Sequence, residues 1–166
     1  ERGGSIAVIN STNATISSNS VSSSAAARDG GSIYCSYCDN VTVRDSKFNG
    51  TYSPWGNGAA IYIDGNATVD NCSFDAFDAL NDNAGIFVYN GNVTIANSTF
   101  DGIYSIWVNV TATAYITANN MTSDVPNKNM TYLGHEDYDI ITNPFPYSVW
   151  NDGTIYLKGN KFDNII

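Results

Sequence analysis

One short phrase recurs along the chain at a constant spacing, and this spacing restricts the fold more than any other feature of the sequence. The copies are NVTVRDSKFNG at residues 40–50, NATVDNCSFDA at 66–76 and NVTIANSTFDG at 92–102, so both steps are 26 residues. A fixed period of this size is typical of stacked supersecondary units, each of which buries its apolar face against its neighbours. The chain is therefore expected to form a solenoid rather than one compact globule.

Weaker copies flank the three strong ones, and aligning all of them produces two apolar columns. A large apolar residue occupies one column: Val21, Phe48, Phe74, Phe100, Met121 and Phe162. An aliphatic residue lies five positions earlier: Ile16, Val43, Val69, Ile95, Ile116 and Leu157. Equivalent positions of successive coils lie on top of one another in a solenoid. We therefore predict that the Phe column forms an aromatic stack inside the molecule.

A second short run precedes each copy and has the pattern of a strand. These runs read SIAVI, SIYCS, AIYID, GIFVY, SIWVN and SVWND. Their apolar residues alternate with period 2, no run has a sustained helical period, and Gly and Asn punctuate between them. Two to three short strands per 21–28 residues predict an all-β solenoid of about six coils, stacked in parallel at ~4.8 Å per coil.

A pair of mostly small or polar residues comes just before the third strand of each coil. The pairs are Asp45–Ser46, Asn71–Cys72, Asn97–Ser98, Ala118–Asn119 and Gly159–Asn160. Asn at a turn can bond its own backbone and its stacked neighbour, which would make a polar ladder. The alternative is a set of ordinary solvated turn residues.

The phrase G-x-I-x-V…N-x-T-V-x-N-S-x-F-x-G resembles the right-handed parallel β-helix proteins of the pectate-lyase-like superfamily. More narrowly, it is similar to the adhesin-like surface proteins of methanogenic archaea and to the polymorphic outer-membrane proteins of chlamydiae. The resemblance extends over nearly the whole chain, from Gly3 to Ile166. It implies a right-handed parallel β-helix, with a structural or adhesive role at a cell surface.

We expect a single domain over residues 1–166, with residues 122–147 forming either an insertion or a degraded coil. The NPFP turn at 143–146 favours an insertion, whereas the length of this segment equals one period. The phrase is cut within a coil at both ends. Two alternatives follow: a segment of a longer surface protein, or a subunit that pairs end to end with itself through exposed strand edges.

The charge of the chain argues against two classes of partner. Seven Lys and Arg residues face sixteen Asp and Glu residues, which makes a net charge of −9. Nucleic acids and anionic membrane surfaces attract basic proteins, so neither is expected as a partner. No apolar run is long enough for a spanning helix. Abundant Asn, Ser, Thr, Gly and Tyr indicate an extracellular or cell-surface protein, with no cofactor expected.

Eleven Asn-x-Ser/Thr sequons occur in the chain, which suggests N-glycosylation of a secreted protein. The alternative is that the repeat itself needs Asn at a turn and Thr in a strand. The candidate acceptors are Asn10, Asn40, Asn49, Asn66, Asn92, Asn109 and Asn129. Loop positions such as Asn10, Asn49, Asn109 and Asn129 are expected to be the best of them.

Three cysteines are present. Cys35 and Cys38 have the C-x-x-C spacing of redox and zinc sites, but no second pair completes a zinc site, and the helix that a thioredoxin-like motif precedes is absent. We predict a local disulfide between these two residues. Cys72 replaces a serine of its column and is expected to be a small buried residue.

Carboxylates that could serve catalysis are sparse. Asp75, Asp78 and Asp82 lie in one loop and are a weak candidate for a calcium site, with a solvated turn as the alternative. The catalytic residues of the pectate-lyase-like enzymes find no matching positions, so no enzymatic activity is expected. A carbohydrate-active enzyme of that class, or a viral fibre or tailspike segment, are the alternatives to the structural or adhesive role.

An aromatic residue lies at the centre of several of the short upstream runs. If the aliphatic residues on either side point inward, these residues point outward: Tyr34, Tyr62, Phe87, Trp107 and Trp150. Such a stripe on the outside of a sheet could stack on sugar rings or pack against another subunit. The alternative is that residues 122–147 cover it.

Overall fold

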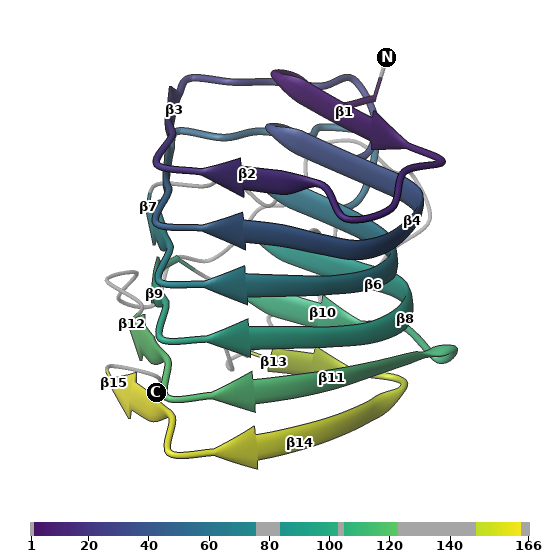
Figure 1. Cartoon of the computed structure of the whole chain (residues 1–166). Helices are drawn as coiled ribbons and strands as arrows, with labels where there is room; N and C mark the ends of the chain where they lie inside the picture. The colour runs from purple at the N-terminus through teal and green to yellow at the C-terminus, as the bar shows by residue number, and fades with distance from the viewer. Residues whose placement is uncertain (1, 76–83, 103–104, 123–148, 164–166) are drawn as a thin grey trace, which may run out of the picture.

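The computed structural model describes residues 2–75, 84–102, 105–122 and 149–163, and these residues form fifteen β-strands and no helix. All of the strand pairs are parallel, and the strands stack as coils from the N-terminal end of the molecule to the C-terminal end (Figure 1). The described residues make six coils, as the sequence period predicts.

Each coil has three legs. The first legs are β1 (Ile6–Ile9), the first parts of β4 (Ile33–Arg44), β6 (Ile61–Asp70) and β8 (Ile86–Ala96), then β10 (Ile106–Val108) and β13 (Val149–Asn151). The second legs are β2 (Thr15–Ser17), the second parts of β4, β6 and β8, then β11 (Ala112–Thr117) and β14 (Thr154–Lys158). The third legs are β3 (Ser20–Ser22), β5 (Lys47–Asn49), β7 (Ser73–Asp75), β9 (Thr99–Asp101), β12 (Asn120–Thr122) and β15 (Lys161–Asp163).

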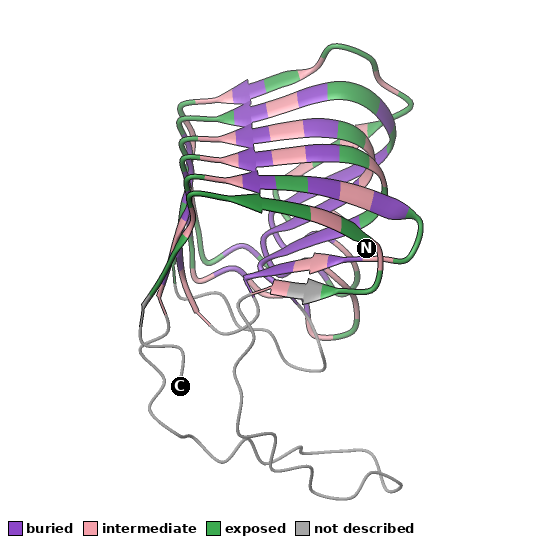
Figure 2. Ribbon diagram, turned by 90° about the horizontal axis from the view of Figure 1, so that it is seen from below, coloured by how far each residue is buried: buried purple, intermediate pink, exposed green. Residues whose placement is uncertain are grey.

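The core runs along the axis of the stack and is built from the predicted columns. Buried positions alternate with less buried ones along the second legs (Figure 2). The rings of Phe48, Phe74 and Phe100 lie 5.1 and 4.7 Å apart, are parallel within 8°, and are each 1% exposed. This confirms the internal stack. Burial of each ring contributes about 1.5–3 kcal/mol.

The turn between the second and third legs repeats one backbone conformation in every coil. Its residues have φ values between 50° and 66°: Ser18, Asp45, Asn71, Asn97, Ala118 and Gly159. Asn, Asp and Gly tolerate this left-handed conformation better than other residues do. The repeated phrase therefore places turn-forming residues where the chain changes direction.

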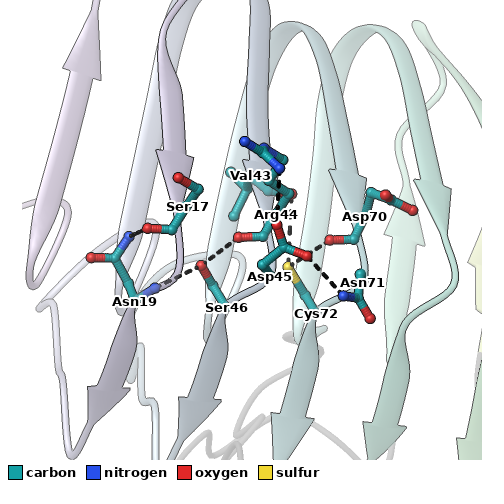
Figure 3. A network of polar contacts seen from close by, with 9 residues as sticks. All are labelled: Ser17, Asn19, Val43, Arg44, Asp45, Ser46, Asp70, Asn71 and Cys72. Carbon is teal, nitrogen blue, oxygen red and sulfur yellow. Dashed lines mark hydrogen bonds and ion pairs between the residues drawn. The ribbon is translucent and has the colours of Figure 1, made fainter.

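A buried hydrogen-bond ladder lies directly behind this turn, which confirms the predicted polar ladder (Figure 3). In four of the six described coils a backbone N–H donates to the side chain at the same position of the next coil. The donor–acceptor distances are 3.2 Å from Asn19 to Ser46, 3.1 Å from Cys72 to Ser98, 2.9 Å from Ser98 to Asn119 and 2.9 Å from Asn119 to Asn160. At Cys72 the thiol donates to the carbonyl oxygens of Val43 in the coil above and Asp70 in its own coil, at 3.7 and 3.3 Å.

The fifth and sixth coils pair with each other directly. Strands β10, β11 and β12 pair with β13, β14 and β15 respectively. The prediction of an insertion or a degraded coil at residues 122–147 falls almost entirely outside the described residues. Residues 123–148 themselves lie outside the described part of the chain.

Candidate functional site

The predicted aromatic stripe forms a cluster of its own. Tyr34, Tyr62 and Phe87 are stacked across adjacent first legs with ring centroids 5.1 and 5.7 Å apart, and Trp107 packs edge-on against Phe87. The cluster is separate from the main core, so these side chains project from the outer side of the sheet, as the alternation predicts. The side chain of Trp150 lies outside the described part of the structure.

The prediction that this stripe is exposed is wrong. Tyr34, Tyr62 and Phe87 are only 5–8% exposed, and Trp107 is half-buried. The guanidinium of Arg2 lies 5.4 Å from the ring of Tyr34 and donates to its hydroxyl, and the ring of Tyr89 packs on Tyr62. Burial raises the pKa of Tyr62 well above its ordinary value, and neighbouring carboxylates add to the effect. The stripe therefore acts as a second apolar cluster instead of an open contact surface.

The predicted disulfide is absent, because Cys35, Cys38 and Cys72 are all free and buried thiols. Cys35 belongs to the main core in register with Val8 and Ile63. The thiol of Cys38 instead donates to the carbonyl oxygens of Val8 and Ser36 at 3.2 and 3.4 Å. The C-x-x-C spacing here bridges the corner between two legs and fills the core with small side chains.

We expect Cys35 and Cys72 to be unreactive in the native protein. Burial is the main cause that raises the pKa of Cys35 to about 12 and that of Cys72 to about 11. Both thiols should resist alkylation at pH 8 and react after unfolding in urea, which mass spectrometry of labelled peptides would detect. Rapid labelling of the native protein would contradict this expectation.

The same shifts predict a loss of stability in alkali. Above the ordinary thiol pKa of 9.0 the unfolded chain loses these protons, while the native state keeps them up to about 12 for Cys35. Stability is therefore full below pH 9 and falls as the pH rises through this window. Urea unfolding at pH 8 and pH 10.5 would measure the loss, and the Cys35→Ala, Cys72→Ser double variant should lose less.

The calcium candidate is not assembled by the residues that can be described. Asp75 is exposed at the end of β7, and Asp78 and Asp82 lie outside the described residues. Within residues 2–75, 84–102, 105–122 and 149–163, no group of three His, Cys, Asp or Glu side chains is placed to hold a metal ion.

The sequon asparagines fall into two structural groups. Asn40, Asn66 and Asn92 are exposed but belong to an outer ladder at the corner before the second legs. The Nδ2 of Asn40 donates to Asn13 at 2.6 Å, that of Asn66 donates to Asp39 at 2.9 Å, and the Asn92 backbone N–H donates to Asn66 Oδ1 at 2.9 Å. This outer ladder was not predicted, although the shared column of Asn residues was its signal.

The other candidate acceptors differ in how exposed their sequons are to solvent. Asn10 is exposed, and Thr12 of its sequon is also exposed. Asn49 is exposed, but Thr51 of its sequon is 0% exposed. Asn109 is half-buried and its Nδ2 donates to the carbonyl of Tyr89 at 3.0 Å. Asn129 lies outside the described residues.

We therefore predict a strict order of occupancy if the folded protein is glycosylated. Asn10 should be modified first, and Asn40, Asn66 and Asn92 least, because glycosylation of Nδ2 would crowd a ladder whose coils are ~4.8 Å apart. In vitro transfer from a lipid-linked donor, followed by peptide mass spectrometry, would measure occupancy at each site. The urea-unfolded chain is the control, in which this order should disappear.

The outer face of the second legs is a regular array of mostly polar side chains that are exposed or half-buried. We call it the second-leg face. It consists of the columns Asn13, Asn40, Asn66, Asn92, Thr113, Thr154; Thr15, Thr42, Thr68, Thr94, Tyr115, Tyr156; and Ser17, Arg44, Asp70, Ala96, Thr117, Lys158.

Two features distinguish this face. The rings of Tyr115 and Tyr156 stack at 4.9 Å within 8° and are 43% and 55% exposed. The charged residues in its columns are Arg44, Asp70 and Lys158, a formal sum of +1 (two positive, one negative) on a chain of net charge −9. Sequence reasoning missed the Tyr pair, although its signal was an aromatic residue just before the aliphatic column in the last two copies.

The described residues contain no helix that is long and apolar enough to cross a membrane. No curated protein and no solved structure matches the chain. The family model described as "Right handed beta helix region" matches residues 1–162, which is nearly the whole chain. Together with the six stacked parallel coils, this match shows that the chain belongs to the right-handed β-helix family.

Proposed function

We propose that this chain is a structural and adhesive β-helix of an extracellular or cell-surface protein, and that it contacts neutral glycans through the second-leg face. The observation that carries the proposal is the array itself. Asn and Thr side chains repeat in register over four successive coils, from Asn13 and Thr15 to Asn92 and Thr94, next to an exposed Tyr pair.

The chemistry of the face suits an uncharged, hydroxyl-rich partner. Thr hydroxyls and Asn amides both donate and accept hydrogen bonds, and their spacing along the rod is set by the coil repeat of ~4.8 Å. Tyr115 and Tyr156 offer apolar ring surface together with a polar hydroxyl. The face carries little net charge, so binding an uncharged sugar chain requires little desolvation of ions.

A rigid rod also fits a structural role. Each coil adds backbone hydrogen bonds and core contacts only to its neighbours, so the shape is maintained by local repetition. The extracellular location is supported by the composition of the chain, with few charged residues and many Asn, Ser, Thr and Tyr residues. It can be examined by labelling intact source cells with antibodies against the second-leg face.

Co-sedimentation with insoluble neutral polysaccharides such as cellulose, chitin and α-glucan tests the adhesive part of the proposal. We expect saturable binding that weakens at least several-fold in the Tyr115→Ala, Tyr156→Ala double variant. The matched control is Tyr37→Ala, because Tyr37 is 76% exposed at the corner before the second leg and is not part of the columns of this face. Saturable cleavage of any polysaccharide would overturn the structural role, and absence of binding to all of them would overturn the adhesive role.

A further inference from the structure

The corner between the first and second legs carries exposed side chains in the second to fifth coils. We call this surface the first corner, and it consists of residues 37–39, 64–65, 89–91 and 109–111. Strands β4, β6 and β8 bend through it, and the turn from β10 to β11 continues it (Figure 1). Each of these four coils pairs with a coil on both sides, so exposure here does not arise from an end of the stack.

Two tyrosines of the first corner lie on β-bulges. In β4 the residues on either side of Tyr37 pair with consecutive residues of β6, and those on either side of Tyr89 in β8 do the same. A bulge leaves its extra residue unpaired and redirects the side chain. The two tyrosines are 76% and 45% exposed, and Val110, at the turn of the fifth coil, is 70% exposed. The first corner therefore presents large apolar side chains to solvent in three interior coils.

The backbone conformation of Tyr37 is unfavourable for a tyrosine. Its φ of 52° lies in the left-handed region, which Asn tolerates better than an aromatic residue does. One coil earlier the same turn position is Asn10, with φ 51°. Tyr37 thus replaces the kind of residue that suits this turn, and its exposed ring adds little to the core. An exposed residue in a strained conformation is typical of a binding position.

The charged side chains of the first corner are all negative. They are Asp39 and Asp64, on adjacent coils, and the four ranges contain no Lys or Arg. Asp39 accepts a hydrogen bond from Asn66 Nδ2 at 2.9 Å, and Asp64 accepts one from Ser36 Oγ at 3.4 Å. Both donors are neutral, so they leave the negative charge uncompensated. The apolar side chains therefore lie beside a negative potential.

We propose that the first corner binds an extended segment of another protein in which Lys or Arg residues stand next to apolar side chains. Tyr37, Tyr89 and Val110 would contact its apolar groups, and the two carboxylates would pair with its cations. Tyrosine is a frequent anchor at protein interfaces. The sign of the charge disfavours anionic partners, and a neutral glycan would leave both carboxylates without a counter-charge. From the second coil to the fifth the corner spans ~14 Å, the length of about four extended residues.

Selection from a phage library of short random peptides tests the kind of partner. The library is first cleared on the bare support and then selected on the immobilised wild-type chain. We expect enrichment of sequences that combine Lys or Arg with aromatic or aliphatic residues. A selection that enriches no sequence, or only acidic or uncharged ones, would overturn the proposal.

The Tyr37→Asn variant separates binding from folding, because it restores the residue type that Asn10 provides one coil earlier. Its urea unfolding midpoint should equal or exceed that of the wild type. Its affinity for the strongest selected peptide, measured by fluorescence anisotropy, should fall about ten-fold or more. A lower midpoint would assign Tyr37 to the fold, and unchanged affinity would place the peptide elsewhere; either result contradicts the inference.

The Asp64→Asn variant tests the charge, because asparagine can still accept the hydrogen bond of Ser36. Peptide affinity should fall several-fold at low salt, and the difference should shrink at high salt. The matched control is Asp75→Asn, which makes the same change of net charge at an exposed position on the third leg. Equal losses in both variants would mean that only the net charge of the chain matters, which would refute a local site.

The glycan assay reports independently of this site. The Tyr115→Ala, Tyr156→Ala double variant should bind the peptide like the wild type, and Tyr37→Asn should bind polysaccharide like the wild type. Loss of polysaccharide binding in Tyr37→Asn would place Tyr37 in the glycan site and refute the peptide site. Peptide binding without any polysaccharide binding would refute only the adhesive role of the second-leg face.

Discussion

Replacement of Phe74 by alanine is expected to lower the free energy of unfolding by about 3–5 kcal/mol. Phe74 is 1% exposed and lies between Phe48 and Phe100 in the internal stack, so its removal leaves a cavity with an aromatic ring above and below. The surrounding coils cannot collapse into this space, because their strands are paired on both sides. Urea unfolding followed by circular dichroism would measure the loss.

The matched control for this substitution is Phe162→Ala, at the same column position in the last coil. Phe162 is 44% exposed, so its truncation should cost well under half as much. Equal losses in the free energy of unfolding for the two variants would show that the contribution of a ring in this column does not depend on its burial.

Replacement of Gly65 by alanine is expected to destabilise the fold by more than about 3 kcal/mol or to prevent folding. Gly65 lies at the corner between the first and second legs with φ 137°, a conformation that residues with a Cβ rarely adopt. A Cβ at this position would overlap the carbonyl oxygen of Cys38 in the coil above. Relief of the overlap would require the coils to separate where they are paired.

Gly159→Ala is the control for this effect. Gly159 also has a positive φ, of 66°, but nothing lies within 4 Å of an added Cβ. The same turn position in the previous coil is already an alanine, Ala118, with φ 54°. We expect a cost of about 1–2 kcal/mol, from backbone strain alone. A Gly65→Ala variant as stable as Gly159→Ala would show that close coil contact at this corner is unimportant.

Much of the fold was predictable because a solenoid turns sequence period into spatial register. Residues 26 positions apart, such as Phe48 and Phe74, are direct neighbours, so a column in the alignment is a column of contacts. The Phe stack and the buried ladder followed from this relation. Glycine was expected between the strands in general, but the close contact with Cys38 that requires a glycine at position 65 depends on how tightly two coils approach.

The candidate site was predicted less well. The sequence period predicts the direction in which a side chain points, but it does not predict which other segments cover that side chain. Tyr34 and Tyr62 project outward as expected and are nevertheless buried. The exposed aromatic pair is Tyr115 and Tyr156, on a different leg. Cys35 and Cys38 have the spacing of a disulfide, but both thiols are free, and that of Cys38 donates to the carbonyl oxygen of Val8 in the neighbouring coil.

The sequence by itself determined the coil repeat, the strand register and the identity of the core columns. These depend on local alternation and on a period that parallel stacking converts directly into contacts. Only the tertiary structure decided which outward residues meet solvent, which asparagines use their amides in a ladder, and that the fifth coil pairs with the sixth. Those properties depend on segments that meet through the fold and on distances between backbones, and neither is encoded in the spacing of one repeat.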